Sequence, residues 1–360
     1  MSYTNGLDKP SDYFNTVLYT GNGSARTITG VGFQPDWVWV KDRSSTNYHY
    51  LYDSVRGNNL NLFSNDTSAE VNVTTGQNGG GIGSQASDGF NIVSGLVNTN
   101  NVNTSGNLYA SWNWLGANGT ASNTDGSITS TVSANTTSGF SIVSYTGTGA
   151  SATVGHGLNV APSFLITKNR SGTDGWIVHT KAITATTWWD TRLLLASTAA
   201  AGSGAGYLTA EPTSTLFAIS SSSPINASGN NYITYCFAEK KGFSKFGSYI
   251  GNGSTDGTFI YTGFKPAFIV LKQTSAAGQN WQMMDNKRNA FNVLNRVIYP
   301  NLSQGEDTTG ATSNTIDFVS NGFKSRGSNA QSNGSGSTYI YMAFAENPLV
   351  GTNNIPATAR

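Results

Sequence analysis

The sequence predicts an all-β protein of three tandem antiparallel β-sandwich modules, jelly-roll-like in type. One pattern of landmark residues occurs three times along the 360-residue chain, and each occurrence closes with a strand whose residues alternate in polarity. The composition agrees, because charged residues make up 11% of the chain, against about a quarter in an ordinary globular protein. Gly, Ser, Thr and Asn replace them, as in β proteins with many turns, while 11% aromatic residues argue against disorder.

Each repeat opens with the pattern Tyr-x-Gly-x-Gly, which predicts a strand that runs into a tight turn. A proline follows the tyrosine after 16, 17 and 17 residues, an apolar run then ends in lysine, and a second tyrosine follows the first after 90, 87 and 90 residues. In chain order these landmarks are Tyr19, Pro35, Lys41 and Tyr109; Tyr145, Pro162, Lys168 and Tyr232; and Tyr249, Pro266, Lys272 and Tyr339. Such regular spacing indicates one module used three times.

The strands are predicted from β-branched and aromatic runs bounded by turn residues. In chain order the predicted strands are 15–19, 26–29, 37–41, 50–57, 88–93, 107–115, 127–132, 139–143, 164–168, 267–272 and 339–346. The three closing strands alternate with a period of two, so that each has one apolar face. The residues of these faces are Ala110, Trp112 and Trp114; Ile233, Tyr235 and Phe237; and Ile340, Met342 and Phe344. No amphipathic helix is predicted.

These elements divide the chain into six segments. They are a leader or arm at 1–13, module 1 at 14–118, a Ser/Thr/Asn/Gly linker at 119–138, module 2 at 139–241, module 3 at 242–346 and a C-terminal arm at 347–360. The leader is either an arm that docks on a neighbouring molecule or a solvated end, and the sequence leaves both open.

Charge and hydropathy exclude several classes of partner. The net charge of +1 gives no electrostatic reason to expect binding to nucleic acid or to an anionic membrane surface. No apolar run reaches the roughly 18 residues of a membrane span, and residues 1–10 lack the basic and apolar segments of a signal peptide. We therefore expect synthesis in the cytoplasm without a cleaved signal. The single cysteine, Cys236, excludes an intrachain disulfide.

An aspartate and an arginine recur after each central strand. The pairs are Asp53 with Arg56, Asp190 with Arg192, and Asp285 with Arg288. The spacing is Asp-x-x-Arg in modules 1 and 3, at 18 and 19 residues after the proline, and Asp-x-Arg at 28 residues in module 2. The pairs predict either a ligand or subunit contact, or a structural ion pair that is repeated because the fold is repeated.

Aromatic residues at or near the strand after each central strand form a second set of candidates. They are Tyr48, Tyr50, Trp188, Trp189 and Trp281. Exposed rings of this kind stack on the apolar faces of sugars, while nearby amides and hydroxyls bind the sugar hydroxyl groups. The same residues suit a core or a subunit interface, so a glycan site is one of two interpretations.

No enzymatic motif emerges. His49, His156 and His179 are scattered and lack metal-ligand spacing, and the chain has no Gly-x-Ser-x-Gly elbow, phosphate loop or His-Glu-x-x-His. The stretch 252–257 resembles a calcium loop but lacks its later glutamate, so turn chemistry explains it better. We expect no catalytic residues, no cofactor and no metal ligands.

Several of these motifs resemble a module of unknown function found in structural and tail-fibre-like proteins of tailed bacteriophages, notably those of marine bacteria and cyanobacteria. The resemblance rests on Tyr-Thr-Gly-Asn-Gly at 19–23, Gly-Phe-Gln-Pro-Asp-Trp-Val-Trp-Val-Lys at 32–41, Leu-Tyr-Asp-Ser-Val-Arg-Gly at 51–57 and the ending at 341–360. It is weaker in module 2, where Gly157-Leu158 replaces Gly-Phe-x-Pro. The resemblance implies a virion protein, and it brings no catalytic residues with it.

The expected function is therefore that of a non-enzymatic virion structural protein, a tail-fibre or spike-type appendage that attaches to the host surface and binds other virion proteins. We expect a homo-oligomer, with a trimer favoured. Decoration of the capsid through the two arms is the alternative. A polysaccharide-degrading tailspike is a third interpretation, which pairing of acidic residues such as Glu211, Asp174, Glu306 or Asp307 across a groove would support.

Overall fold

The computed structural model describes residues 7, 9–75, 80–94, 101–183, 186–204, 206–308 and 315–348. Regular structure in these ranges is almost entirely antiparallel β, so the all-β prediction is confirmed. Helical structure there is limited to the 3-10 turns η1 (Pro10–Asp12) and η2 (Trp188–Asp190) and the single turn α1 (Ser223–Asn226). In the same ranges no helix is long and apolar enough to cross a membrane.

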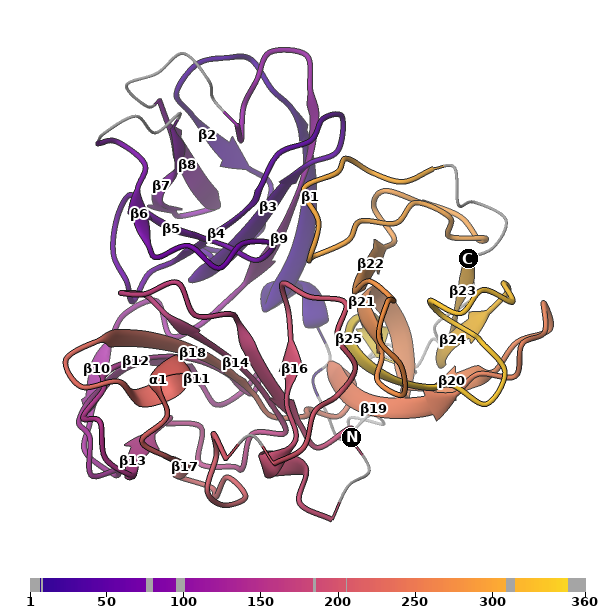
Figure 1. The fold of residues 1–360 in the computed structure, drawn as a ribbon. Helices are drawn as coiled ribbons and strands as arrows, with labels where there is room; N and C mark the ends of the chain where they lie inside the picture. The colour runs from indigo at the N-terminus through magenta and orange to yellow at the C-terminus, as the bar shows by residue number, and fades with distance from the viewer. Residues whose placement is uncertain are drawn as a thin grey trace, which may run out of the picture.

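The strands form three units, which Figure 1 shows grouped around a common centre. In unit 1 a large sheet has the order β1 (Phe14–Thr20), β9 (Leu108–Trp114), β3 (Trp37–Asp42), β4 (His49–Asp53), β5 (Leu60–Phe63) and β6 (Val71–Asn72), and a small sheet has the order β2 (Arg26–Thr29), β8 (Gly89–Val93) and β7 (Gly81–Ala86).

Units 2 and 3 are built in the same way. The large sheet of unit 2 is β10 (Ala121–Asn123), β11 (Ser130–Asn135), β12 (Phe140–Thr146), β18 (Asn231–Phe237), β14 (Phe164–Asn169), β15 (Ile177–Thr180) and β16 (Leu193–Leu194), and its small sheet is β13 (Ala152–Gly155) and β17 (Leu216–Ile219). The large sheet of unit 3 is β19 (Ser244–Ile250), β25 (Thr338–Pro348), β21 (Phe264–Gln273) and β22 (Gln282–Asp285), and its small sheet is β20 (Phe259–Tyr261), β24 (Gly322–Ser325) and β23 (Ile316–Val319).

The order opening strand, closing strand, central strand and next strand recurs in all three large sheets: β1-β9-β3-β4, β12-β18-β14-β15 and β19-β25-β21-β22. In each unit the opening tyrosine is the direct cross-strand partner of the closing tyrosine. The rings of these pairs stack with centroids 4.9, 5.2 and 4.9 Å apart. The repeated sequence pattern therefore marks the same structural position three times.

The Tyr-x-Gly-x-Gly pattern has a steric reason. A Cβ at the first glycine would lie 2.0 Å from the Thr104 carbonyl oxygen in unit 1, and 2.3 and 2.4 Å from carbonyl oxygens at the matching places in units 2 and 3. An asparagine on the facing turn accepts the next backbone N–H, at 3.1 Å for Asn103, 2.8 Å for Asn226 and 3.1 Å for Asn333. The opening tyrosine hydroxyl donates to a carbonyl of the same turn at 2.7 Å in every unit.

Each unit is a sandwich in which the outer face of the large sheet packs against the small sheet. Separate apolar clusters fill these three spaces. In unit 1, for example, Ile28 and Phe90 of the small sheet pack with Val38 and Tyr109 of the large sheet. Within each unit, the two packed sheets form the sandwich that the sequence predicts.

The inner faces of the three large sheets share one further core. A single cluster takes buried side chains from all three units, including Trp37 and Trp114, Phe140 and Tyr235, and Phe344. The apolar faces of the three closing strands all contribute to it. The three units are thus not self-contained modules, because a large part of the apolar surface of each unit is buried against the other two.

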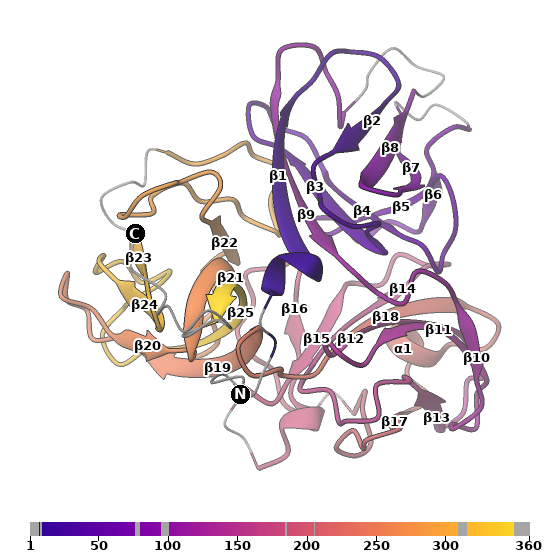
Figure 2. The same ribbon diagram turned by 180° about the vertical axis from the view of Figure 1, so that it is seen from behind.

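The segments between and beside the predicted modules are also part of the fold. The predicted linker at 119–138 holds β10 and β11, which extend the large sheet of unit 2. In the leader, η1 lies at the start of β1 (Figure 2), and the Leu7 N–H donates to the Lys241 carbonyl at 3.0 Å. β25 ends at Pro348, and the rest of the predicted C-terminal arm lies outside the described residues.

Candidate functional site

Asp53 and Arg56 form a buried ion pair at the turn that follows β4. The side chains of both are fully buried, and the Asp53 carboxylate accepts the Arg56 Nε–H and, at 2.9 Å, the Arg56 backbone N–H. A third donor comes from unit 2, because the Tyr235 hydroxyl donates to Asp53 Oδ2 at 2.7 Å. The pair therefore lies at the junction between units 1 and 2.

Glu70 extends this pair across the same junction. It accepts from Arg56 Nη1 at 3.0 Å and from Arg170 of unit 2 at 3.0 and 2.8 Å in a bidentate contact. The Glu70 backbone N–H also donates to the Arg170 carbonyl at 2.9 Å. Charged groups that are this well paired and hydrogen-bonded can remain buried.

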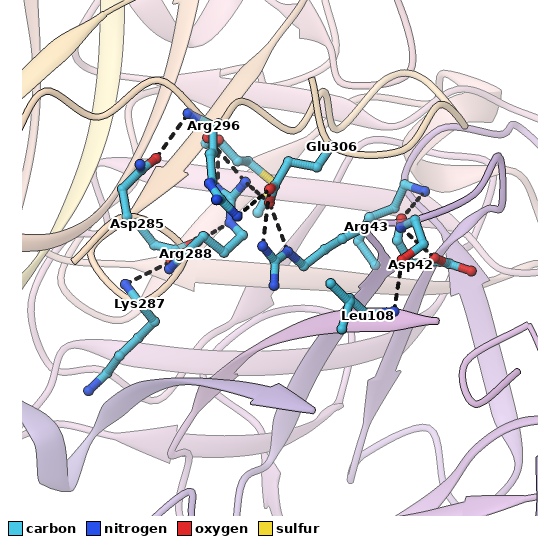
Figure 3. A network of polar contacts seen from close by, with 12 residues as sticks. Asp42, Arg43, Leu108, Asp285, Lys287, Arg288, Arg296 and Glu306 are labelled. Atoms are coloured by element: carbon cyan, nitrogen blue, oxygen red, sulfur yellow. Dashed lines mark hydrogen bonds and ion pairs between the residues drawn. The ribbon is translucent and has the colours of Figure 1, made fainter. Parts of the chain in front are cut away.

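Unit 3 repeats the arrangement at its junction with unit 1 (Figure 3). Arg288 Nε donates to Asp285 Oδ2 at 2.6 Å, and Trp112 of unit 1 donates to the same oxygen at 3.1 Å. Glu306 takes the place of Glu70 and binds Arg43 of unit 1 at 2.8 and 3.0 Å. Burial alone would raise the pKa of Glu306, but the arginines Arg43, Arg288 and Arg296 lower it below its usual value. Both predicted Asp-x-x-Arg pairs are thus interface braces within one chain.

The predicted pair in unit 2 is wrong as an ion pair. Asp190 accepts from the backbone N–H groups of Gly204 and Gly206 at 3.1 and 2.9 Å, while the Arg192 guanidinium lies over the Tyr207 ring, 5.4 Å from its centroid. Within the described residues no salt bridge joins the two. Asp190 instead holds a glycine-rich loop in place.

The cross-strand register identifies the true counterpart in unit 2. The residue two positions after the landmark proline lies on each central strand and is the cross-strand partner of Asp53, Thr180 or Asp285, so Thr180 stands where the other units have aspartate. Thr180 follows Pro162 by 18 residues, against 18 and 19 in the other units, so the spacing from the proline could have identified this position. Three residues on, Ile183 replaces the arginine and packs against the central core.

The junction between units 2 and 3 keeps the backbone contact without the charges. The Ala201 N–H donates to the Thr274 carbonyl at 3.0 Å, as the N–H groups of Glu70 and Glu306 do at the other junctions. Thr274 stands two residues after the central-strand lysine, where the other units have Arg43 and Arg170. This arginine was the missed sequence signal for the two ionic junctions.

Three buried lysines also join the units. Lys41, Lys168 and Lys272 are each 0% exposed, and each donates its ammonium to a carbonyl of a neighbouring unit. The acceptors are Ser303 at 3.0 Å, Thr67 at 2.9 Å and Thr198 at 3.3 Å, in that order. Burial lowers the pKa of all three lysines to about 8. The three units thus form a closed ring of contacts. The lysine of unit 1 donates to unit 3, that of unit 2 to unit 1, and that of unit 3 to unit 2.

A ring N–H at the start of the strand after each central strand, or directly before it, makes a parallel set of contacts. His49, Trp176 and Trp281 reach the carbonyls of Tyr299, Phe63 and Leu194 at 3.1, 2.7 and 3.0 Å. His49 Nδ1 accepts from the Trp39 indole at 2.9 Å, which leaves the proton of neutral imidazole on Nε2. Burial lowers the pKa of His49, in keeping with this neutral form.

Most of the aromatic residues considered as a candidate glycan site are buried and cannot contact a ligand. Tyr50, Trp188 and Trp281 are 4%, 4% and 2% exposed, so the prediction of exposed rings is wrong for them. Trp189 is half-buried and packs edge-on against Trp188. Tyr48 is exposed and stacks on Phe63, with ring centroids 4.8 Å apart. The sequence does not separate core from surface aromatics here because the strand after each central strand is buried on both faces.

A different exposed apolar surface lies on unit 3. Five of the nine exposed large apolar side chains among the described residues belong to unit 3. Phe259 and Tyr261, at alternate positions of the edge strand β20, are 46% and 58% exposed. The other three are Ile250, Phe291 and Val293. We call Phe259 and Tyr261, which lie on the same side of β20, the unit 3 apolar face.

The charged groups beside this face are paired with one another. Lys324, the cross-strand partner of Phe259, binds Asp256 at 2.6 Å. Arg326 binds Asp317 at 2.5 Å. The face is therefore apolar, and the charged side chains beside it are bound to one another as ion pairs.

The acidic residues considered for glycoside hydrolysis are already engaged. Glu306 is bound by arginines, and Asp307 accepts from the Tyr299 hydroxyl at 2.8 Å. Asp174 accepts from Asn169 at 2.7 Å, and Glu211 from Lys181 at 2.9 Å. In the described part of the chain no group of three His, Cys, Asp or Glu residues could hold a metal ion.

Residues 9–348 match a protein-family model described as a domain of unknown function (DUF7483). Neither the curated proteins nor the solved structures include one that matches this chain.

Proposed function

We propose that this chain, which belongs to the DUF7483 family of domains of unknown function, is a non-enzymatic structural protein of a tailed-bacteriophage virion. Its role would be that of a tail-fibre or spike-type appendage that contacts a glycan on the host surface through the unit 3 apolar face. The resemblance of residues 19–23, 32–41 and 51–57 to phage structural modules supports the setting. The use of the buried charged groups as braces supports a structural role.

The observation that carries the proposal is the confinement of exposed aromatic side chains to one of three equivalent positions. Ile28, Val154 and Ile260 each face a phenylalanine across the small sheet of their unit, which aligns the three edge strands. The residues that flank them are Thr27 and Thr29, Thr153 and Gly155, and Phe259 and Tyr261. Only unit 3 departs from small or hydroxyl residues, and exposed aromatics of this kind mark a binding surface.

The chemistry of the face suits an uncharged sugar. Phe259 and Tyr261 lie on the same side of β20, about 7 Å apart along the strand, and present apolar ring faces on which sugar rings can stack. Lys324 and Arg326 form ion pairs with Asp256 and Asp317. An acidic ligand would therefore have to compete with these aspartates for the two cations. A neutral glycan therefore fits better than an anionic one.

The described part of the leader weighs against the decoration alternative. Capsid decoration would use residues 1–13 and 347–360 as arms across neighbouring subunits. Leu7 is instead bonded to Lys241 of its own chain, and the Tyr13 ring packs edge-on against Phe243, with centroids 6.0 Å apart. The engaged state of Glu211, Asp174, Glu306 and Asp307 likewise gives the degrading tailspike no support. The expected homotrimer stays a prediction.

Binding of the purified full chain to host cells tests the glycan proposal. The double variant Phe259→Thr and Tyr261→Thr installs the residues of unit 1, so it should fold. We expect it to lose at least about tenfold in cell binding, while Tyr48→Ala, at an exposed tyrosine of unit 1, keeps its binding. Periodate treatment of the cells, which cleaves sugar rings, should abolish binding of the native chain. Undiminished binding by the double variant, or to treated cells, would contradict the proposal.

A further inference from the structure

A small cavity lies where unit 1 meets unit 3. Its volume is about 60 Å³, and its walls come from β1, β21, β25 and the turn after β22, including Thr16, Ala267 and Asn286. Units 1 and 2, and units 2 and 3, are consecutive in the chain, whereas units 1 and 3 are joined only by noncovalent contacts. The cavity is thus part of the seam that closes the ring.

Two side chains that line the cavity have buried polar atoms without a hydrogen-bond partner. Asn286 is 2% exposed, and neither its Nδ2 nor its Oδ1 is paired; Thr16 is 5% exposed, and its Oγ1 is unpaired. A buried polar group left without a partner is costly, and native proteins rarely tolerate one. Three such atoms around one cavity therefore indicate an occupant.

The matching place in unit 1 shows how the protein satisfies this position elsewhere. The backbone N–H of Ser54 donates to the Asp36 carbonyl at 2.8 Å, as that of Asn286 donates to the Ala267 carbonyl at 2.9 Å. In unit 1 the Asp36 carboxylate accepts from the Ser54 hydroxyl at 2.6 Å and from the Gly116 N–H at 2.8 Å. In unit 3 alanine replaces that aspartate, which removes the acceptor and leaves space beside Asn286.

From these observations we infer that the seam cavity binds ordered water, which bridges Thr16 and Asn286. The amide of Asn286 presents a free donor and a free acceptor, so its partner must both accept and donate. Water does both, whereas a bare cation cannot accept a hydrogen bond and a simple anion cannot donate one. The volume exceeds the roughly 10–15 Å³ that a single water molecule requires.

A crystal structure of the full chain at about 1.5 Å resolution tests the inference directly. We expect water peaks at hydrogen-bond distance from Nδ2 and Oδ1 of Asn286 and from Oγ1 of Thr16. An empty cavity, or an ion or crystallisation additive in place of water, would overturn it.

The variant Asn286→Leu gives a second readout in solution. If water is bound, leucine removes two of its partners and the melting temperature falls by about 2 °C. If the cavity is dry, leucine replaces an unpaired amide with a side chain of similar size, and the melting temperature is unchanged or rises. Asn58→Leu, at an exposed asparagine, corrects for the effect of the substitution itself.

Discussion

The hydroxyl of Tyr235 in unit 2 donates to the carboxylate of Asp53 in unit 1 at 2.7 Å. This bond and its counterpart, from Trp112 of unit 1 to Asp285 of unit 3 at 3.1 Å, place a closing-strand residue of one unit on the buried ion pair of another. The Asp-x-x-Arg sequence pattern is thus one half of a junction, and the closing strand provides the other half.

The first prediction concerns the ion pair. Asp53→Asn leaves the Arg56 guanidinium buried with one anionic partner fewer, so we expect the free energy of unfolding to fall by about 3–5 kcal/mol. Tyr235→Phe removes one hydrogen bond and should cost about 1–3 kcal/mol. Urea unfolding measures both. Asp190→Asn, in the unit 2 loop, is the matched control, and a loss as large there as at Asp53 would refute the junction role.

The second prediction builds the missing ionic junction. Ala201→Glu and Thr274→Arg place a glutamate and an arginine where their backbone contact already matches that of Glu70 with Arg170. We expect each single variant to be neutral or destabilising and the pair to couple favourably by about 0.5–1 kcal/mol. A double-mutant cycle from urea unfolding gives the coupling energy, and a value of zero would show that the junctions are not equivalent.

The third prediction follows from the buried lysines. Their pKa of about 8 in the folded chain lies below the value of about 10.4 expected when unfolded. Between these values the unfolded state binds more protons, so stability rises with pH, by up to about 1.4 kcal/mol per pH unit for each lysine.

Tyrosines set the upper limit of this pH window. Burial raises the pKa of Tyr19, Tyr145 and Tyr249, so above about pH 10 the unfolded state loses protons first and stability falls again. We expect the midpoint of urea unfolding to increase from pH 8 to pH 10 and then decrease. Lys272→Met should weaken the increase, and a midpoint that is flat or falls from pH 8 to pH 10 would contradict the assignment.

The fourth prediction tests the repeated turn. Gly21→Ala puts a Cβ 2.0 Å from the Thr104 carbonyl oxygen, which the backbone can relieve only by moving, so we expect a loss of about 2–4 kcal/mol. Gly119→Ala is the control, because a Cβ there meets nothing within 4 Å. Thermal unfolding of both variants measures the difference, and equal melting temperatures would contradict the steric account.

The sequence predicts the fold well where a residue is constrained by its own unit. The tyrosine, glycine and asparagine of each turn contact one another across a single sheet, so their spacing recurs and can be recognised. The period-two face of Ala110, Trp112 and Trp114 is likewise visible in the sequence. What that face packs against is not, because the alternation specifies burial without naming the partner surface, and the partner proved to be the other two units.

The candidate site was harder to predict for the same reason. Glu70 and Arg170 are 100 residues apart, and nothing local connects them. Asp190 and Arg192 were proposed because an Asp/Arg pair follows each central strand, although the spacing from Pro162 in the other units pointed to Thr180. The prediction of exposure was wrong for Tyr50 and Trp281. An aromatic residue on a short strand gives the same sequence pattern whether the strand lies in a core or at the surface.

Localising the protein on intact virions, by labelling and electron microscopy with a count of copies per particle, tests the central claim most directly. The appendage proposal predicts a handful of copies at the tail, in multiples of three if the expected trimer forms. Tens to hundreds of copies spread over the head, or absence from purified particles, would contradict it.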